Sequence, residues 1–545
     1  GAAPVTTGPN ETAPGTPEGS PKVSQGNPTT LPTVAPNPPS NGVTSNNPNF
    51  AGFNALSHVD SRLASSGNQF SLEPPDQGLC AGNGMVLEAV NSVLAVYSAA
   101  PGHTLLKTPT ALNAFLGLPP AITRTSTPVI FGPFVGDPKC YFDPQTQHWF
   151  LTTFDEDRDP LTGLAIRDFT ALAVSQTTDP TGLWTVFLID ASDDGQNGTP
   201  AHPSCPCFGD QPLIGADNNG FYISTNEFAL NGPGFNGAQV YALSKAGIIA
   251  AATGGPLPTV VHIDASGALV PFGGLSYSVQ PATSPNLFYS GAHGGFEYFL
   301  SALDFLATLD NRVAVWAMTN TKSLSSATPS VNLTVVVISS ETYGQPPNAT
   351  QRNGPRPLGT SLGDPIETLA TNDDRMNQVV FAQGWLWSGV NTIVQNNKAA
   401  PRSGIAYFVV NPGWSGSNLV ASMFSQGYVA QQGANVLFPS IGVTTAGKAV
   451  MSFTLSGPSY FPSTAYAYIS ATSGSSKIHI AGAGQLPEDG FTGYPQFGGT
   501  GVARWGDYSA AVASGNTVWL AAEYIPNLPR TTLANWGTFI SSVRP

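Results

Sequence analysis

A short cassette of Gly-Asp followed by a strand-like run recurs through the chain, and it constrains the fold more than any other feature. Clear copies begin at Gly136, Gly209, Gly363 and Gly506. Looser copies begin at Asp76, Ser276 and Phe438. A motif that returns in this way indicates one supersecondary unit that can bury its apolar face only against further copies of itself.

The segments after each cassette follow a common plan. After Gly209-Asp210, an apolar run leads to an Asn-Asn-Gly turn, an aromatic-rich strand and a further strand. This succession is typical of one propeller blade, and the 59 Gly and 49 Pro favour an all-β chain with many turns. We therefore predict a seven-bladed β-propeller over residues 51–545. A stack of two sandwiches is the alternative, but it gives no reason for seven matching cassettes.

The two ends of the predicted propeller suggest how its ring closes. The last blade has only three predicted strands, and the stretch from Asn54 to Phe70 is available to supply the missing outer strand. Closure of this kind would remove free sheet edges. The best helix candidate is the short piece from Ala242 to Ala252, which Gly254-Gly255 follows.

Residues 1–50 form a separate, proline-rich region. It contains three charged residues (Glu11, Glu18 and Lys22) and no aromatic residue before Phe50. Such a segment buries too little apolar surface to offset its ordering entropy, so we expect an extended, polyproline-like arm. A neighbouring subunit is the obvious support for this arm, which predicts a homo-oligomer or polymer.

Charge and hydropathy narrow the range of partners and locations. Only 10% of residues are charged and the net charge is −13, which argues against nucleic acid and anionic membranes as partners. No apolar run reaches the 18 or so residues of a membrane span. Glycans and cations remain compatible. The chain begins at Gly1, which we interpret as a mature form without its signal peptide, and we expect a secreted, extracellular or cell-surface protein.

Four sequons suit a secreted glycoprotein, although chance occurrence in a chain rich in Asn and Thr explains them equally well. Their asparagines are Asn10, Asn197, Asn332 and Asn348.

The Asp residues of the cassettes are candidate metal ligands. If each cassette begins an innermost strand, these carboxylates meet at one mouth of the central channel, where they would suit a hard cation such as Ca²⁺. The alternative is that each Asp binds backbone N–H groups at the start of its own strand. The residues of this predicted ring are Asp76, Asp137, Asp210, Asp364 and Asp507.

The four cysteines predict disulfides, as an even count does in a secreted chain. We favour Cys80–Cys140, because the two lie at similar places in neighbouring blades, together with Cys205–Cys207. A competing interpretation is a metal site that uses His202, Cys205 and Cys207, although a fourth ligand is not evident.

Catalytic signatures are weak, and we assign no catalytic residue. The P-loop and His-Glu-x-x-His motifs are absent from the sequence. Two acidic groups could serve acid/base cleavage of a glycosidic bond, but such clusters in loops more often bind water or cations. They are Asp155, Glu156 and Asp157, and Asp193 and Asp194.

Several segments, among them EPPDQGLCAGNG, GDPKCYFD, CPCFGDQPLIGADNNGFYISTNEF and RWGDYSAAV, resemble a group of largely uncharacterised secreted bacterial β-propeller proteins that are loosely sialidase-like in fold. The resemblance covers about residues 70–545 and implies the fold rather than an activity. Sialidases need an arginine triad, and nothing singles one out among Arg312, Arg375, Arg504 and the other arginines. Ser192-Asp193-Asp194-Gly195 only faintly resembles a sialidase box, so sialidase activity is disfavoured.

Three functions follow from these features. We favour a non-catalytic extracellular structural propeller that self-assembles through its arm. The first alternative is a glycan-binding module that uses a channel mouth with aromatic and Asp side chains. The second is a glycoside hydrolase or lyase, which would need two carboxylates about 5 to 9 Å apart beside aromatic platforms.

Overall fold

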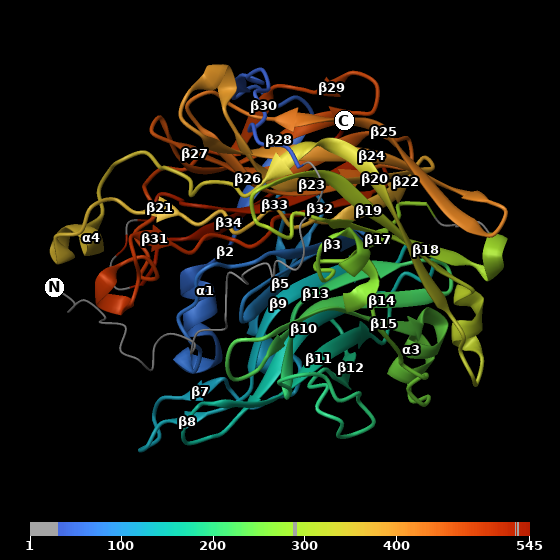
Figure 1. Cartoon of the computed structure of the whole chain (residues 1–545). Helices are drawn as coiled ribbons and strands as arrows, with labels where there is room; N and C mark the ends of the chain where they lie inside the picture. Colours follow the sequence, from blue (N-terminus) through green and yellow to red (C-terminus); the bar gives the residue numbers. More distant parts are fainter. Residues whose placement is uncertain (1–30, 287–290, 529, 531–532) are drawn as a thin grey trace.

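The structure is a computed structural model that describes residues 31–286, 291–528, 530 and 533–545. The chain is all-β, with 49% strand and 9% helix. Its strands form antiparallel four-stranded groups that follow one another along the sequence, the arrangement of a β-propeller (Figure 1). Among the described residues, no helix combines the length and the apolar character that crossing a bilayer requires.

The first four groups run in sequence order from the centre outward. The first contains β3 (Gly78–Gly82), β4 (Met85–Val90), β5 (Val93–Ser98) and β6 (Leu105–Ala111). The second contains β9 (Phe134–Phe142), β10 (Trp149–Arg158), β11 (Ala165–Ser175) and β12 (Trp184–Asp190). The third contains β13 (Cys207–Ala216), β14 (Gly220–Ala229), β15 (Phe235–Ser244) and β16 (Val261–Asp264). The fourth contains β17 (Gln280–Thr283), β18 (Phe296–Ala302), β19 (Leu309–Thr319) and β20 (Asn332–Gly344).

The remaining groups follow the same plan, and the last one takes its outer strand from the N-terminal part of the chain. The fifth contains β22 (Val379–Ala382), β23 (Trp385–Val394), β24 (Arg402–Ser415) and β25 (Asn418–Val429). The sixth contains β26 (Asn435–Val443), β27 (Ala449–Gly457), β28 (Tyr460–Ser470) and β30 (Ile478–Gly482). The last contains β32 (Ala510–Ser514), β33 (Thr517–Tyr524), β34 (Gly537–Val543) and β2 (Phe50–Ser57).

Short elements connect or decorate these sheets. The short strands are β1 (Val43–Thr44), β7 (Ile122–Thr123), β8 (Ile130–Phe131), β21 (Thr368–Leu369), β29 (Gly474–Ser475) and β31 (Val502–Ala503). The helices are α1 (His58–Leu63), α2 (Leu112–Phe115), α3 (Lys245–Ala252) and α4 (Pro357–Leu362). The predicted helix therefore begins three residues later than expected, because residues 242–244 complete β15.

The first strands of the groups close into a ring. In chain order β3 contacts β9, β9 contacts β13, β13 contacts β17, β17 pairs with β22, β22 contacts β26 and β26 contacts β32. The ring closes because β32 contacts β3. Each of these strands lines a central cavity of about 150 Å³.

The last group is closed by a strand from the other end of the chain, as the sequence predicted. β2 pairs antiparallel with β34, with Phe50 opposite Val543 and Phe53 opposite Ile540. The strand is Phe50–Ser57 rather than a run from Asn54 to Phe70, because Ser57 ends it by capping α1: its side chain accepts from the Asp60 N–H while Asp60 bonds back to the Ser57 N–H.

The described part of the proline-rich region packs against the propeller of the same chain. The Gln395 N–H donates to the Pro36 carbonyl at 2.8 Å, and Asn41 bonds to Ala430 in both directions. β1 then adds to the edge of the sixth group by pairing with β30, where Figure 1 shows the blue N-terminal segment. Residues 1–30 lie outside the described residues, and so does the Asn10 sequon.

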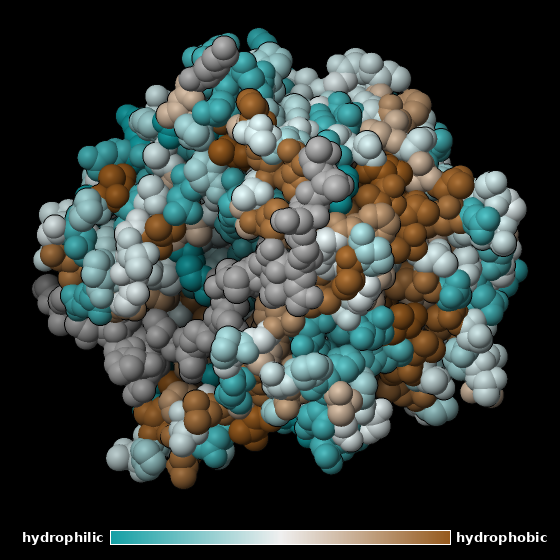
Figure 2. All heavy atoms as spheres, in the orientation of Figure 1, coloured by the Kyte–Doolittle hydropathy of each residue, from teal (hydrophilic) through white to brown (hydrophobic). Residues whose placement is uncertain are grey.

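Most aromatic residues belong to the core between sheets. Trp149, Trp316, Trp387 and Trp505 are among the largest fully buried side chains. Strands such as β26 and β27 are buried along their whole length, because neighbouring sheets cover both of their faces. Figure 2 shows hydrophilic and hydrophobic residues interspersed over the visible face, with much of the hydrophobic surface where Figure 1 labels β18, β19 and β22.

Six cassettes begin innermost strands, but the cassette at Gly363 does not. Gly363 adopts φ +75° as the C-cap of α4, and β21 follows it and pairs with β31 outside the ring. The fifth innermost strand is β22, which residues 372–378 precede. The prediction for this copy was wrong because Gly-Asp also suits a helix C-terminus, where glycine supplies the left-handed conformation.

Candidate functional site

The structure brings four of the five predicted Asp residues together at one end of the central ring. Asp76 interacts electrostatically with Asp137 and Asp507, and Asp137 interacts with Asp210. Asp364 lies elsewhere, after α4, where its N–H donates to the Gly359 carbonyl. Among the described residues, no three of the five predicted carboxylates offer oxygens within 4.8 Å of one another. The Ca²⁺ site therefore stays a prediction.

Asp76 binds groups of the protein itself. One carboxylate oxygen accepts from the Asp507 N–H at 2.6 Å and the other accepts from Asn91 Nδ2 at 2.7 Å. The Asn91 side-chain oxygen in turn accepts from the Asp137 N–H at 2.9 Å. This chain of bonds connects the first, second and last sheets. Asp76 therefore binds a backbone N–H, as the alternative to a cation ring expected, but one of another sheet rather than of its own strand.

Asp137 and Asp210 form a second, more isolated pair. Burial and the neighbouring carboxylates raise the pKa of Asp137 well above its usual range. Burial raises the pKa of Asp210 to about 7, although Arg375 opposes the shift. The two carboxyl groups are close enough for each to affect the titration of the other.

Cations at the mouth balance this acidity. Arg375 donates to both oxygens of Asp373 at 2.9 and 3.0 Å and to Gln211 Oε1 at 3.0 Å. Lys139 lies over the ring of Tyr508, and burial lowers its pKa to about 7. The sequence did not place Arg375 at the mouth, because the Gly363 cassette, rather than residues 372–378, was expected to start the fifth innermost strand.

Buried carboxylates elsewhere in the ring of sheets serve the backbone. Glu297 accepts from the Ala282 N–H at 2.9 Å, Glu523 accepts from the Gly506 N–H at 2.9 Å, and Asp168 accepts from the Gly209 N–H at 2.8 Å. These bonds satisfy N–H groups within β17 and β13 and in the segment before β32, which would otherwise be buried without a partner.

Innermost strands also share a bulge next to the cassette. In β9, β13 and β26 the register shifts at a residue with positive φ that a proline follows. These residues are Asp137 (φ 51°), Gln211 (φ 55°) and Phe438 (φ 59°). A bulge turns the strand, and here it aims the Asp137 and Gln211 side chains toward the mouth of the channel.

The four cysteines are bonded in the pairing that the sequence favoured. Cys80 and Cys140 connect β3 to β9, and Cys205 and Cys207 form a bridge just before β13. Both sulfurs of the second bridge are therefore unavailable as thiolate ligands, which overturns the metal site of His202, Cys205 and Cys207.

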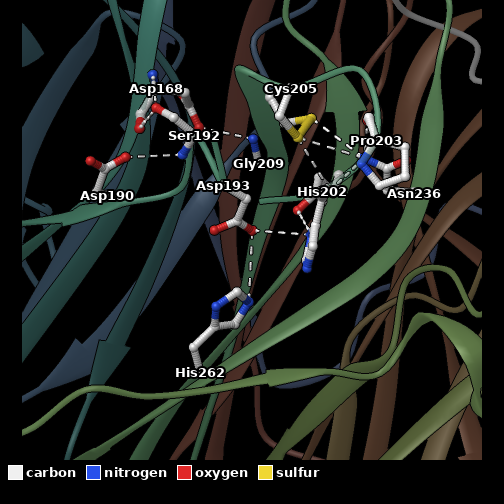
Figure 3. The surroundings of a disulfide bond; sticks show 12 residues. Asp168, Asp190, Ser192, Asp193, His202, Pro203, Cys205, Gly209, Asn236 and His262 are labelled. Carbon is white, nitrogen blue, oxygen red and sulfur yellow. Dashed lines mark hydrogen bonds and ion pairs between the residues drawn. A yellow bond between two sulfur atoms is a disulfide. The ribbon is translucent and has the colours of Figure 1, made fainter. Parts of the chain in front are cut away.

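Beside this bridge lies a cluster of imidazole and carboxylate groups that the sequence did not bring together. The loop between β12 and β13 supplies Asp193 and His202, β14 supplies Glu227, and β16 supplies His262. His202 Nδ1 lies 3.0 Å from both Glu227 oxygens and 3.7 Å from Asp193 Oδ2. Figure 3 shows Asp193 pointing toward both His202 and His262.

The other acidic group considered for catalysis is held differently. Glu156 pairs with Arg158 in the buried part of β10, while burial raises the pKa of Asp155 to about 7. Asp194 belongs to the exposed side of its loop and lies 3.4 Å from Arg167. None of the residues of the two acidic groups lines any of the described cavities.

A groove of about 660 Å³ lies between the fifth and sixth groups of strands, whose innermost strands are β22 and β26. Trp385, Trp387 and Tyr468 supply its aromatic lining, and Lys448 is the charged side chain that reaches it. Its remaining lining is rich in hydroxyl and amide groups, from Gln383, Ser470, Thr472, Ser473, Ser475 and Ser476.

Trp385 and Tyr468 are the half-buried aromatic residues of this groove, and Trp385 has an exposed aromatic neighbour. Trp385 stacks on Phe424 with ring centroids 4.3 Å apart and an interplanar angle of 18°, and Phe424 is itself 46% exposed. Trp387 is buried and donates its ring N–H to the Ala382 carbonyl at 3.1 Å. Nothing in the sequence distinguishes the tryptophan that reaches the surface from the buried one.

The three asparagines of the described sequons are exposed. Asn197 lies in the loop that carries Asp193, Asn332 begins β20, and Asn348 lies in the loop that follows β20. Their glycosylation remains a prediction.

Comparison with known proteins gives distant structural neighbours only. No family model matches the chain, and no curated protein matches it. A polysaccharide lyase of family PL25, an ulvan lyase, is 10% identical with a TM-score of 0.33 over 90% of this chain and 93% of its own. An exo-β-1,3-galactanase from Clostridium thermocellum is 9% identical with a TM-score of 0.29, over 88% and 98% of the two chains. A mutant Trypanosoma rangeli sialidase is 11% identical with a TM-score of 0.31, over 76% and 54%. Likenesses of this degree carry no activity over to the chain.

Proposed function

We propose that the protein is an extracellular, seven-bladed, carbohydrate-binding propeller, and that the groove beside Trp385 is its glycan site. The observation that carries the proposal is a half-exposed tryptophan, held on Phe424, in a groove of about 660 Å³. Ligand sites of this size typically combine an apolar lining with a few polar groups that fix orientation. Sugars present both an apolar ring face and hydroxyl groups, so they match such a lining.

The composition of the groove favours a glycan over other polymers. The rim offers hydroxyl and amide groups that can both donate and accept hydrogen bonds. A single lysine and a net charge of −13 do not suit a nucleic acid or an anionic membrane. The channel mouth, which the sequence favoured for a glycan site, is less suitable. Lys139 covers the ring of Tyr508 there.

Two other functions have less support. A glycosidase needs a pair of Asp or Glu carboxyl groups beside the scissile bond, and neither Asp nor Glu is among the described residues that line the groove. Self-assembly through the arm was expected because an extended arm was thought to need a neighbouring subunit to order it. The described residues of the arm instead bind Gln395, Ala430 and β30 of the same chain.

The test is affinity electrophoresis and calorimetry of the full chain against a panel of soluble neutral and acidic polysaccharides. We expect at least one to bind, and Trp385→Ala to weaken that binding about 10- to 30-fold, as truncation of an aromatic anchor does. Trp184→Ala is the matched control, because Trp184 is also half-buried and contacts an aromatic ring, Phe115, here edge-on, but lies outside the groove.

A second pair of variants distinguishes the class of glycan. Lys448→Gln should weaken binding of an acidic polysaccharide and leave a neutral one unaffected, while Lys477→Gln, exposed but outside the groove, should change neither. The proposal fails if no polysaccharide of the panel binds, or if Trp385→Ala binds as tightly as the wild type.

A further inference from the structure

The loop from Ser192 to Cys207 folds back on itself and places two potential ligands side by side. The His202 N–H donates to the Asp193 carbonyl at 2.8 Å, and Asp194 pairs with Ala201 as a β-bridge. The Cys205–Cys207 disulfide closes the end of this loop at the start of β13. Asp193 and His202 are therefore fixed opposite each other by backbone bonds rather than by a bond between their side chains.

The side chains that meet here have the spacing of metal ligands. One atom from each of Asp193, His202 and Glu227 lies within 4.8 Å of the others. Two ligands about 2.0–2.1 Å from a tetrahedral ion lie about 3.3 Å apart. The observed separations from His202 Nδ1, 3.0 Å to Glu227 and 3.7 Å to Asp193, lie on either side of that value.

Asp193 supplies a second and independent observation. Its side chain is fully buried, and neither of its carboxylate oxygens accepts a hydrogen bond from a described residue. A buried carboxylate without donors is costly unless it is protonated or binds a cation. Asp193 points toward His202 and His262 (Figure 3), with His262 Nε2 3.8 Å from its Oδ2. A Glu227 oxygen lies within 4.8 Å of the ligand atoms of Asp193 and His202.

Neighbouring side chains bind Glu227 and His262, as the outer-sphere partners of a metal site would. Asn236 donates to Glu227 Oε1 at 2.6 Å. Gln239 donates to Asp264 at 3.1 Å, so its oxygen accepts from His262 Nε2 at 2.9 Å. His262 is thus occupied as a donor, and it would position Asp193 rather than bind the ion. Partners of this kind set the orientation and basicity of metal ligands.

We propose that Asp193, His202 Nδ1 and Glu227 bind one divalent transition-metal ion of the Zn²⁺ class, with water in the remaining position. The imidazole nitrogen selects against Ca²⁺ and Mg²⁺, which prefer sets of oxygen ligands. The site lies at the third sheet, away from the groove of the proposed glycan site, so the two proposals stand independently.

The test is metal binding by the full chain with its disulfides intact, after removal of metal with a chelator. Free-thiol titration first excludes thiolate ligands from reduced Cys205 and Cys207. Zn²⁺ is then titrated by calorimetry and Co²⁺ by its visible d–d absorption. We expect one ion per chain, and a Co²⁺ band of the intensity that four-coordinate sites give. Ca²⁺ should not compete.

Variants identify the ligands. Asp193→Asn and His202→Gln should each weaken Zn²⁺ binding at least about tenfold. His148→Gln is the matched control, because His148 is also half-buried and bonds only to a nearby carbonyl, that of Thr146. The proposal is wrong if the wild type binds less than one Zn²⁺, or if Asp193→Asn binds it unchanged. Circular dichroism checks that each variant is folded, and the wild-type Co²⁺ spectrum decides the case if a variant is not.

Discussion

The channel mouth and the cluster beside the Cys205–Cys207 bridge both bury several acidic side chains, yet they differ in what surrounds those side chains. At the mouth, Asp76 accepts two hydrogen bonds, and Arg375 holds Asp373 with two more. In the cluster, the buried Asp193 accepts none from the described residues and faces an imidazole instead. Buried acidity is therefore structural where the fold supplies donors, and it indicates a ligand site where the fold withholds them.

The largest effect should come from removal of the guanidinium at the mouth. Arg375→Ala leaves Asp373 and Asp210 buried without their cation, and loss of one partner of a buried ion pair costs about 3–5 kcal/mol. The measurement is urea unfolding at pH 7. Arg352→Ala is the control, because Arg352 is exposed and packs on Phe461, and it should cost less than about 1 kcal/mol. Equal midpoints for the two variants would contradict a structural role for the mouth.

Two carboxyl groups within the mouth should respond differently to the same substitution. Asp76→Asn loses an acceptor for the Asp507 N–H or for Asn91 and should cost about 1–3 kcal/mol. Asp137→Asn should cost less, about 0.5 kcal/mol, because burial and like charges raise the pKa of both carboxyl groups but only that of Asp76 holds the Asp507 N–H and Asn91. Urea unfolding of the two variants at pH 7 measures the difference, and a larger loss for Asp137→Asn would reverse the assignment of roles.

The smallest effect concerns the pH dependence of the metal-free cluster. Burial raises the pKa of Asp193 to about 8, above its unfolded value, so its protonated form stabilises the folded state below pH 4 and that contribution is lost as pH rises toward 8. Asp193→Asn removes this loss. Between pH 5 and 8 the free energy of unfolding of the variant should therefore change by about 1 kcal/mol less than that of the wild type. This value allows for screening by solvent, which reaches the partly exposed His202 and His262. Unfolding at the two pH values with chelator present measures it. Parallel pH profiles would mean that Asp193 is ionised in the metal-free protein.

The sequence predicted the repeating architecture but not the arrangement of its side chains. Gly-Asp marks the start of β9, β13 and the segment before β32, because a bulged strand start and its N–H groups favour these residues. The same dipeptide at Gly363 caps a helix, and no local signal separates the two uses. The fifth inner strand begins instead after a run of polar residues that includes Arg375.

The candidate sites were harder to predict because they combine distant segments. Asp193, His202, Glu227 and His262 come from a loop and two different strands, and their spacing in the sequence matches no ligand motif. The groove likewise depends on which of Trp385 and Trp387 faces outward, and alternation along β23 places both on one side. Only the position of Trp385 at the first residue of the strand, next to the exposed Gln383-Gly384 turn, leaves it half-exposed.

The pairing of β2 with β34 has a consequence for biosynthesis. Phe50 is made early and Val543 late, yet they are opposite each other in one sheet. During translation, the other sheets can form in order, but β2 has no partner until β34 has been made. The hydrogen-bonding edge of β2 is therefore exposed for almost the whole period of synthesis. Closing so long a loop is slow and is the last event that the chain can complete. Folding of this chain should therefore depend more on chaperones that cover an early strand than on the stability of any single sheet.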